Sequence, residues 1–280
     1  MIEPSNKLSI FVNMKTLLIL FIIALAVSSI GWKKFIYFIS IGYGFSIAAC
    51  AIAIAIIYRH CLTLPAALLC AILFAYGCRL GGYLLIRELK SASYRKVLSE
   101  STKEEGYPIG VTAIIWISCA ILYVAEVSPV AFMLGNKEAG SPVNSTWAWI
   151  GAVVMVFGVC LEAVADAQKS AAKRINPGSF VSTGLYRMVR CPNYFGEMVT
   201  WTGCLLVCFG ACCNVWQWIL AIVGYLGIVY IMFSGARRLE IRQNRNYGSD
   251  PAYQAYVART PILVPFLPIY SVERHKWLRG

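Results

Sequence analysis

The sequence carries little charge for its length. Only 14% of its 280 residues are Asp, Glu, Lys or Arg, whereas hydrophobic residues make up 59%. Soluble globular domains contain about 25% charged residues. The shortage of charge therefore excludes soluble, disordered and fibrous proteins, and it indicates a protein that crosses a membrane several times.

Acidic residues are the scarcest charged group. The chain has 13 Asp and Glu against 25 Lys and Arg, which gives a net charge of +12. In a soluble protein this excess would suggest nucleic acid as a partner. Here the basic residues cluster between apolar runs, which indicates membrane orientation and an anionic ligand, and we expect no nucleic-acid partner.

Motifs for metal, nucleotide-loop and nucleophilic chemistry are also missing. Eleven cysteines are present but no CxxC pair, and the two histidines, His60 and His275, are far apart in the sequence. There is no GxGxxG after a strand, no Walker loop and no HExxH. We therefore expect no metal site, no disulfide framework and no serine or cysteine triad.

Long apolar runs are abundant, and runs of about 20 apolar residues are long enough to span a bilayer as helices. Seven such runs occur, at residues 8–30, 35–57, 62–86, 109–134, 147–167, 194–213 and 215–235. The predicted fold is all-α, a polytopic membrane protein with about seven transmembrane helices.

The distribution of Lys and Arg predicts the orientation. Twenty of the 25 lie in the connections at residues 30–35, 86–109 and 167–194 and in the tail after residue 235. The positive-inside rule then places the C-terminal tail in the cytoplasm and the N-terminus outside. We expect a multi-pass protein of a bacterial inner membrane or the endoplasmic reticulum.

Polar residues form a stripe in the third run. Tyr76, Arg79, Tyr83 and Arg87 are spaced by three or four residues, so they share one helix face. They line a pocket, or alternatively Arg87 extends to the membrane surface and the tyrosines are interface aromatics. Arg79 lies about two turns deeper than Arg87, which favours the pocket. Glu126, near the outer end of its run, is equally explained as a hydrated end residue.

Acids and then bases follow each other at the end of the fifth run. Glu162 and Asp166 are followed by Lys169 and Lys173 on one helix face. This order suits a nucleotide, whose hydroxyls would meet the acids and whose phosphates would meet the bases. A helix that emerges into water and gains ion pairs explains it too.

The start of the sixth run resembles an anion site. Pro192 suits the first turn of a helix, which would place Asn193, Tyr194 and Glu197 in that turn beside free N–H groups. Arg187 and Arg190 precede it.

The tail contains a second basic stripe, Arg238, Arg242 and Arg245, on one helix face. It is accompanied by the tyrosines Tyr247, Tyr253 and Tyr256. Anionic lipid headgroups are an alternative partner for these arginines.

Three segments resemble the steroid 5-alpha-reductase family. They are residues 165–169, residues 184–197 and residues 240–261. The resemblance is closest to the family's largely uncharacterised bacterial-type branch and extends more distantly to sterol C14 reductases. It implies N-terminal transmembrane helices at residues 1–60 and a reductase-like domain with the cofactor site at residues 61–280.

The family resemblance implies a membrane reductase that uses NADPH to reduce an activated carbon–carbon double bond. Asp166, Asn193 and Glu197 match positions that contact the cofactor. The complete predicted cofactor site is Asp166, Lys173, Arg190, Asn193, Tyr194, Glu197, Arg238, Arg242 and Tyr256. Tyr76 matches the tyrosine that hydrogen-bonds the substrate carbonyl, and with Arg79 it forms the predicted catalytic pair.

The sequence departs from the family at three places. Cys191 stands where many relatives have His, and Glu162 stands where they have Asn. The steroid enzymes pair their tyrosine with a Glu from an earlier span, but the first two runs here contain no acid. One of the two residues that would hydrogen-bond the substrate carbonyl is therefore missing. Its absence argues against steroid 3-ketones as substrates more than it argues against the reductase class.

The expected partners are a lipophilic substrate that enters from the bilayer and the membrane lipids themselves; the oligomeric state is unknown. Hydride would add to the β-carbon of an enone, and Tyr76 would stabilise the charge on the carbonyl oxygen. Alternatives are a membrane S-adenosylmethionine-dependent methyltransferase of the isoprenylcysteine or phospholipid type, a transporter, a non-catalytic lipid-binding protein and an inactive relative that binds cofactor without turnover.

Overall fold

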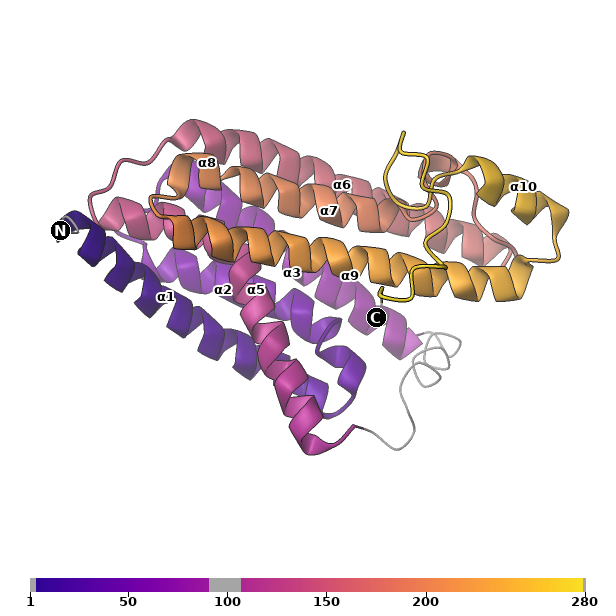
Figure 1. Cartoon of the computed structure of the whole chain (residues 1–280), viewed down its shortest axis with the longest axis horizontal. Coiled ribbons are helices and arrows are strands. Elements are labelled where there is room, and N and C mark those ends of the chain that lie inside the picture. The colour runs from indigo at the N-terminus through magenta and orange to yellow at the C-terminus, as the bar shows by residue number, and fades with distance from the viewer. Residues whose placement is uncertain (1–3, 91–106, 279–280) are drawn as a thin grey trace. The chain divides into compact units, whose positions relative to one another are not determined.

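The computed structural model describes residues 4–90 and 107–278, and within them all regular structure is helical. Figure 1 shows the order of the elements along the chain. They are α1 (Pro4–Ser28), η1 (Ser29–Trp32), η2 (Phe35–Tyr37), α2 (Ile41–Ile57), α3 (Leu64–Lys90), α5 (Ile109–Glu138), α6 (Ser145–Ile175), η3 (Gly184–Arg187), α7 (Pro192–Leu206), α8 (Cys208–Ala211), α9 (Val215–Tyr247) and α10 (Pro251–Arg259). Most of the basic connection predicted at residues 86–109 lies outside the described residues.

Among the described residues, seven helical stretches are long and apolar enough to cross a membrane, so the predicted all-α architecture is confirmed. They are Leu8–Trp32, Phe35–Ile57, Leu64–Lys90, Ile109–Glu138, Ser145–Ile175, Pro192–Ala211 and Val215–Tyr247. The cytoplasmic placement of the tail stays a prediction. This chain is an integral membrane protein.

Two helices continue well past the ends of the apolar runs that predicted them. α6 extends to Ile175 rather than residue 167, and α9 extends to Tyr247 rather than residue 235. Hydropathy marks the part of a helix that lies in lipid, whereas the helix itself continues into water. The basic residues in both last turns favour this extension, because cations interact well with a helix C-terminus.

The chain divides into two compact units. Unit 1 comprises residues 1–152 and 204–225, and unit 2 comprises residues 153–203 and 226–280. Helices α6, α7 and α9 contribute residues to both. The predicted boundary between residues 60 and 61 stays a prediction.

In unit 1, glycines let α2 and α3 approach closely. A Cβ atom on Gly44 would lie 2.6 Å from the backbone nitrogen of Gly81, and one on Gly77 would lie 2.4 Å from the carbonyl oxygen of Gly44. Backbone contact of this kind is typical of membrane helices that pack through small residues. The two helices therefore meet at a fixed, short separation.

A buried network of uncharged polar side chains also joins α1, α5 and the start of α9 in unit 1. Asn136 and Gln217 exchange two hydrogen bonds between their amides, of 3.0 and 3.1 Å. The Asn136 Oδ1 atom also accepts from Ser9 (2.6 Å) and Asn13 (2.7 Å). Hydropathy did not predict this network, because none of its members is charged.

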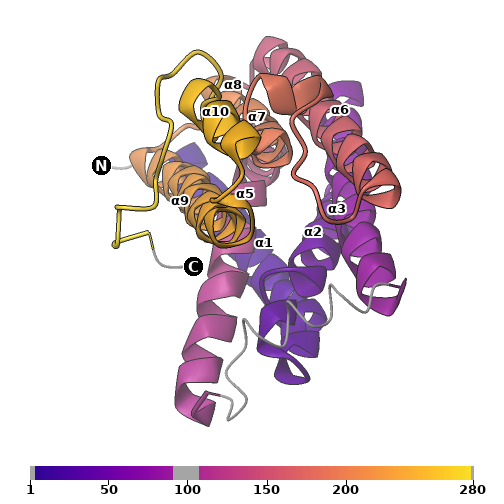
Figure 2. The same cartoon turned by 90° about the vertical axis from the view of Figure 1, so that its right-hand side faces the viewer.

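Unit 2 consists of the remaining parts of α6, α7 and α9, together with η3, α10 and the C-terminal segment (residues 261–278). A Cβ atom on Gly196 would lie 2.7 Å from the backbone nitrogen of Glu162, so α6 and α7 touch through their backbones. Asp250 caps α10, since its side chain accepts from the Ala252 N–H at 2.8 Å. Figures 1 and 2 show the C-terminal segment running back beside α9.

Candidate functional site

Three buried carboxylates lie on α6 and α7 in unit 2. Glu162 and Asp166 are 3% and 8% exposed on α6, and Glu197 is 6% exposed on α7. The close contact at Gly196 brings the two helices together at this level. The structure therefore places the predicted Asp166 and Glu197 on neighbouring helices.

The start of α7 holds the next predicted residues. The helix begins at Pro192, as its sequence position suggested, with Asn193 and Tyr194 in the first turn and Glu197 one turn later rather than in that turn. A Cβ atom on Gly235 of α9 would lie 3.3 Å from the Tyr194 ring. The Tyr194 side chain thus packs against α9.

Two arginines of α9 lie near this point. Tyr194 is within electrostatic range of Arg238 and Arg242. Arg238 is exposed, and Arg242 and Asn193 are partly exposed. Within residues 4–90 and 107–278, none of these three side chains forms a hydrogen bond to another protein group. Their donors therefore remain available to a ligand.

Lys173, by contrast, is engaged by the protein itself. Its Nζ atom donates to the carbonyl oxygens of Pro177 (3.1 Å) and Ser179 (2.5 Å) and to the Tyr247 hydroxyl (3.0 Å). An ammonium has three N–H donors. Lys173 therefore fastens the loop after α6 to the last residue of α9.

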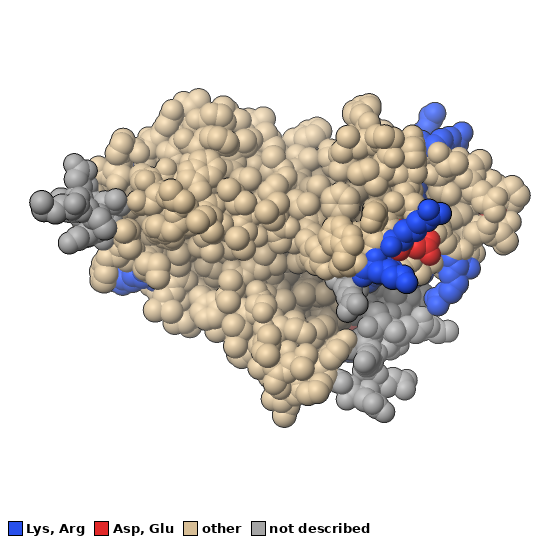
Figure 3. All heavy atoms as spheres, in the orientation of Figure 1, with Lys and Arg blue, Asp and Glu red and all other residues tan. Residues whose placement is uncertain are grey.

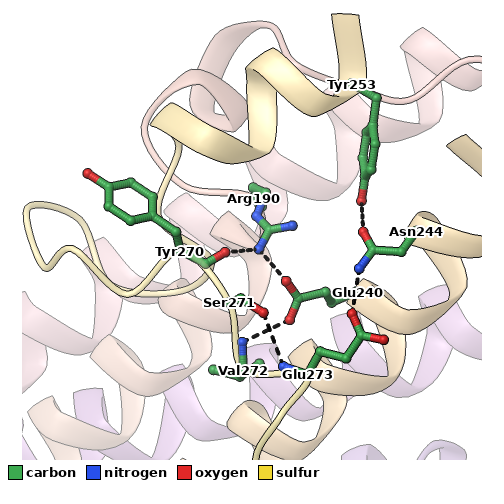
Figure 4. A network of polar contacts seen from close by, with 8 residues as sticks. All are labelled: Arg190, Glu240, Asn244, Tyr253, Tyr270, Ser271, Val272 and Glu273. Atoms are coloured by element: carbon green, nitrogen blue, oxygen red, sulfur yellow. Dashed lines mark hydrogen bonds and ion pairs between the residues drawn. The ribbon is translucent and has the colours of Figure 1, made fainter. Parts of the chain in front are cut away.

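Arg190 forms a buried ion pair with Glu240 (Figure 4). Both side chains are at most 3% exposed, and the Arg190 Nη2 atom lies 2.8 Å from Glu240 Oε1. The same Nη2 atom donates to the Tyr270 carbonyl, while Glu240 Oε2 accepts from the Val272 N–H at 2.9 Å. The pair thus connects the turn before α7, helix α9 and the C-terminal segment.

Aromatic residues attach α10 to the rest of unit 2. The Tyr256 hydroxyl donates to the Tyr186 carbonyl at 2.7 Å, and its ring stacks on Phe180 at 5.5 Å. The Tyr253 hydroxyl donates to Asn244 at 2.8 Å (Figure 4). Burial raises the pKa of Tyr256 above its ordinary value. Both hydroxyls stay protonated at neutral pH and serve as donors.

Cys191 immediately precedes α7. Many members of the steroid 5-alpha-reductase family, which this sequence resembles, have His at this position. Cys191 is 2% exposed, and its N–H donates to the Ile262 carbonyl at 2.9 Å. Burial raises the pKa of the Cys191 thiol to about 12. The thiol therefore stays neutral at physiological pH and acts as an apolar packing group.

In unit 1, the predicted Tyr76 is fully buried on α3 and its hydroxyl lies 3.1 Å from the Tyr43 hydroxyl on α2. The Tyr43 ring also packs against Tyr123 of α5, with ring centres 5.1 Å apart. Arg79, the second predicted catalytic residue, follows Tyr76 by one turn of α3. Sequence reasoning missed Tyr43; the signal was a lone tyrosine between two glycines in an apolar run.

Two further acids of unit 1 are buried. Glu126 is 3% exposed in α5, so it is not a hydrated end residue. Glu88, which sequence reasoning passed over, is 6% exposed at the end of α3 and binds Lys34 at 2.6 Å and the Tyr37 hydroxyl. The hydrogen bond that Lys34 donates to the Glu88 carboxylate raises the pKa of Lys34.

The described residues define a helical membrane protein with seven potential spans, buried carboxylates on α6 and α7, and exposed or partly exposed arginines on α9. A family model described as a protein of unknown function (DUF1295) matches residues 15–260, and the chain belongs to this family.

Two curated proteins are similar to the chain. Steroid 5-alpha-reductase DET2 of Arabidopsis thaliana is 26% identical over 121 residues, which cover 41% of this chain and 42% of that protein. The uncharacterised protein C594.04c of Schizosaccharomyces pombe is 26% identical over 156 residues, 49% of this chain and 44% of that protein. The chain thus spans less than half the length of these relatives. No solved structure matches it.

Proposed function

We propose that this protein is a membrane reductase that uses NADPH to reduce an activated carbon–carbon double bond in a lipophilic, steroid-like or enone-like substrate. Similarity to a plant steroid 5-alpha-reductase supports the reaction class. The observation that carries the proposal lies in unit 2. There, the donors of Asn193, Arg238 and Arg242 have no protein partner within the described residues, and Tyr194 lies within electrostatic range of both arginines and of the buried Glu197.

The chemistry of these groups fits a phosphorylated nucleotide. Guanidinium groups recognise phosphate through paired N–H donors, and an amide at a helix start adds to the N–H groups there. Asp166 and Glu197 would accept hydrogen bonds from ribose hydroxyls. Asn193, Arg238, Arg242 and these two acids would therefore hold NADPH, with the Tyr194 ring packed beside them.

Lys173, Arg190 and Tyr256 take a supporting role in this proposal. Their polar groups already bind carbonyls, a carboxylate or a hydroxyl of the protein. They hold the loop after α6, the C-terminal segment and α10 in place. Each would therefore act on the cofactor by positioning its neighbours.

The proposed carbonyl site lies in unit 1. Bound NADPH supplies a hydride for the β-carbon of the enone. Tyr76 donates a hydrogen bond to the substrate carbonyl, whose oxygen gains negative charge during the reaction. Tyr43 donates to Tyr76 in turn, and a donor chain of this kind polarises its last member. The steroid enzymes pair this tyrosine with a Glu from an earlier span. In this chain Tyr43, which also lies on an earlier span, would take the place of that Glu.

The surroundings of the pair fit an apolar substrate. Tyr43 and Tyr76 are at most 5% exposed, so water is excluded from them. Arg79, one turn away, favours the build-up of negative charge on the carbonyl oxygen. A second side chain, or a water molecule that enters with the substrate, would then protonate the α-carbon. The proposed orientation has the substrate entering from lipid and the cofactor from the cytoplasm.

A two-stage experiment tests the function. Purified protein in detergent is first heated with NADPH or with S-adenosylmethionine, and a rise in unfolding temperature with NADPH alone supports the proposal. Enone lipids and steroids are then screened by loss of nicotinamide absorbance. A shift with S-adenosylmethionine alone would point to a methyltransferase, and NADPH binding without turnover of any enone would point to a non-catalytic protein.

A further inference from the structure

The C-terminal segment ends beside the membrane-spanning part of α9. The Tyr230 hydroxyl donates to the Trp277 carbonyl at 3.0 Å, and the two rings lie 6.1 Å apart. Arg237 holds the same stretch through hydrogen bonds to the carbonyls of Glu273 (2.9 Å) and Leu278 (3.4 Å). The end of the chain therefore follows α9 backwards from Arg237 to Tyr230.

The depth of Trp277 follows from the composition of α9. Residues 215–236 contain no charged residue, and Arg237 is the first charge of the helix. At 1.5 Å per residue these residues cover about 33 Å, close to the thickness of a bilayer core of about 30 Å. Tyr230 lies about 10 Å on the lipid side of Arg237. Trp277, which contacts Tyr230, therefore lies on the lipid side of Arg237 rather than in bulk water.

A second apolar group of the segment reaches the surface at Phe266. This side chain is 93% exposed, and its φ of 66° lies in the left-handed region that bulky residues rarely adopt. The loop closes at its base, where the Ile262 N–H donates to the Ile269 carbonyl at 2.8 Å. The backbone thus holds a large aromatic ring away from the protein.

The base of this loop lies at the same membrane edge. The N–H groups of Arg190 and Cys191 donate to the carbonyls of Pro261 and Ile262, each at 2.9 Å. These two donors immediately precede Pro192, where α7 begins its apolar span. Phe266 and Trp277 therefore both lie near the plane where helices leave the bilayer.

Basic residues surround these exposed aromatics. Arg187 and Arg259 line an open cleft of about 240 Å³ together with Met188 and Phe266. On the face shown in Figure 3, Lys and Arg side chains gather over α9 and α10. Within residues 261–278 the only acid is Glu273, which accepts a hydrogen bond from Asn244 at 2.7 Å.

We propose that residues 261–278 lie in the headgroup layer of the bilayer and bind anionic phospholipid. Phe266 and Trp277 enter the interface, where aromatic side chains are favoured. Arg187 and Arg259 contact headgroup phosphate, as cations beside a membrane do. This inference concerns lipid contact alone and holds whether or not the protein is a reductase.

Photolabelling of the full chain in lipid nanodiscs tests the proposal. A trace phospholipid carries a diazirine next to its glycerol backbone, and mass spectrometry locates the labelled peptides. We expect label on peptides that contain Phe266 and Trp277, and none on residues 250–254 at the start of α10. Label at Phe266 should be about 25-fold higher in phosphatidylglycerol than in phosphatidylcholine, the effect of two engaged cations at about 1 kcal/mol each.

Controls make the outcome decisive. The Arg187→Gln/Arg259→Gln variant should lose the preference for phosphatidylglycerol, whereas Arg245→Gln, an exposed arginine of α9, should keep it. Label on Ile109, a 79% exposed residue at the start of the α5 span, shows that the probe works. Absence of label on both tail peptides despite label on Ile109 would overturn the proposal, as would equal label on residues 250–254. Loss of the loop label when NADPH is added would assign the cleft to the cofactor instead.

Discussion

The hydroxyl oxygens of Tyr43 and Tyr76 lie 3.1 Å apart and join α2 to α3 within unit 1. Either hydroxyl can be the donor. If Tyr43 donates to Tyr76, the Tyr76 hydroxyl can donate its own proton to a third group. A carbonyl oxygen placed beside Tyr76 would fix this direction of donation. This pair is the basis of the first two predictions.

Replacing Tyr76 by Phe should slow turnover and leave cofactor affinity unchanged. Loss of one donor to a developing oxyanion lowers kcat by about 100-fold or more. Steady-state kinetics on any enone that is turned over, together with NADPH titration, measure both quantities. Tyr83→Phe, on the same helix, is the matched control and should keep its kcat. Full activity of Tyr76→Phe on every such enone would refute the assignment of Tyr76 as carbonyl donor.

Replacing Tyr43 by Phe should reduce kcat by about tenfold, because Tyr43 acts through Tyr76 and not on the substrate. The double variant should then be no slower than Tyr76→Phe alone, since residues that act as a unit are not additive. Kinetics of the two single variants and the double variant decide this. Additive losses would mean that Tyr43 contributes through packing or by an independent contact.

Asn193→Ala and Arg242→Ala should each weaken NADPH binding by about 10- to 150-fold, since each removes a hydrogen bond to a charged group worth roughly 1.5–3 kcal/mol. Fluorescence titration of NADPH measures the change in Kd. Asn246→Ala and Arg245→Ala are the matched controls, because both residues are exposed further along α9. Unchanged Kd values in the two test variants would place the cofactor elsewhere.

The Arg190–Glu240 pair should dominate the stability of unit 2. Glu240→Gln leaves a buried guanidinium without a counter-charge, which costs about 3–5 kcal/mol of unfolding free energy. Thermal unfolding in detergent should show a lower Tm. The Arg190→Met/Glu240→Leu variant should recover much of the loss, since it leaves no unpaired charge. If this double variant is less stable than Glu240→Gln, the lost hydrogen bonds to the C-terminal segment outweigh the charge.

Cys191 should resist alkylation in the folded protein. The thiolate is the reactive form, and burial raises the pKa of this thiol to about 12. N-ethylmaleimide at pH 8 should therefore label the exposed Cys213 and leave Cys191 intact, as read by mass spectrometry. The raised pKa also stabilises the fold below pH 9, and this contribution should disappear as the pH rises from 9 towards 12. Equal labelling of both thiols would show that the segment opens.

The sequence was sufficient for the spans because the bilayer dictates their length and polarity. It was insufficient for their ends, since α6 and α9 leave the lipid as continuous helices. The network around Asn136 stayed hidden for a related reason. Its uncharged amides barely change the hydropathy of a run, although they determine which helices pair.

The candidate site residues, too, were predictable from the sequence in part and visible only in the fold in part. Asp166 and Glu197 were recognisable because an acid in an apolar run needs a reason to be there. Arg190 has the same sequence signature as a ligand-binding arginine, yet its partner Glu240 lies fifty residues away and only the fold reveals the pair. Tyr43 gave only a weak signal, a lone tyrosine between two glycines, and its contact with Tyr76 became visible only when α2 was seen packed against α3.

The glycine contacts between α2 and α3 have a consequence for substrate choice. Since a Cβ atom on Gly44 or Gly77 would overlap the backbone of the facing helix, the two backbones lie in contact, and a larger residue at either position would force them apart. The width of the proposed carbonyl site is thus set by main chain rather than by adjustable side chains. We therefore expect this site to accept a thin, flat ring edge or a narrow chain end and to reject branched groups beside the carbonyl.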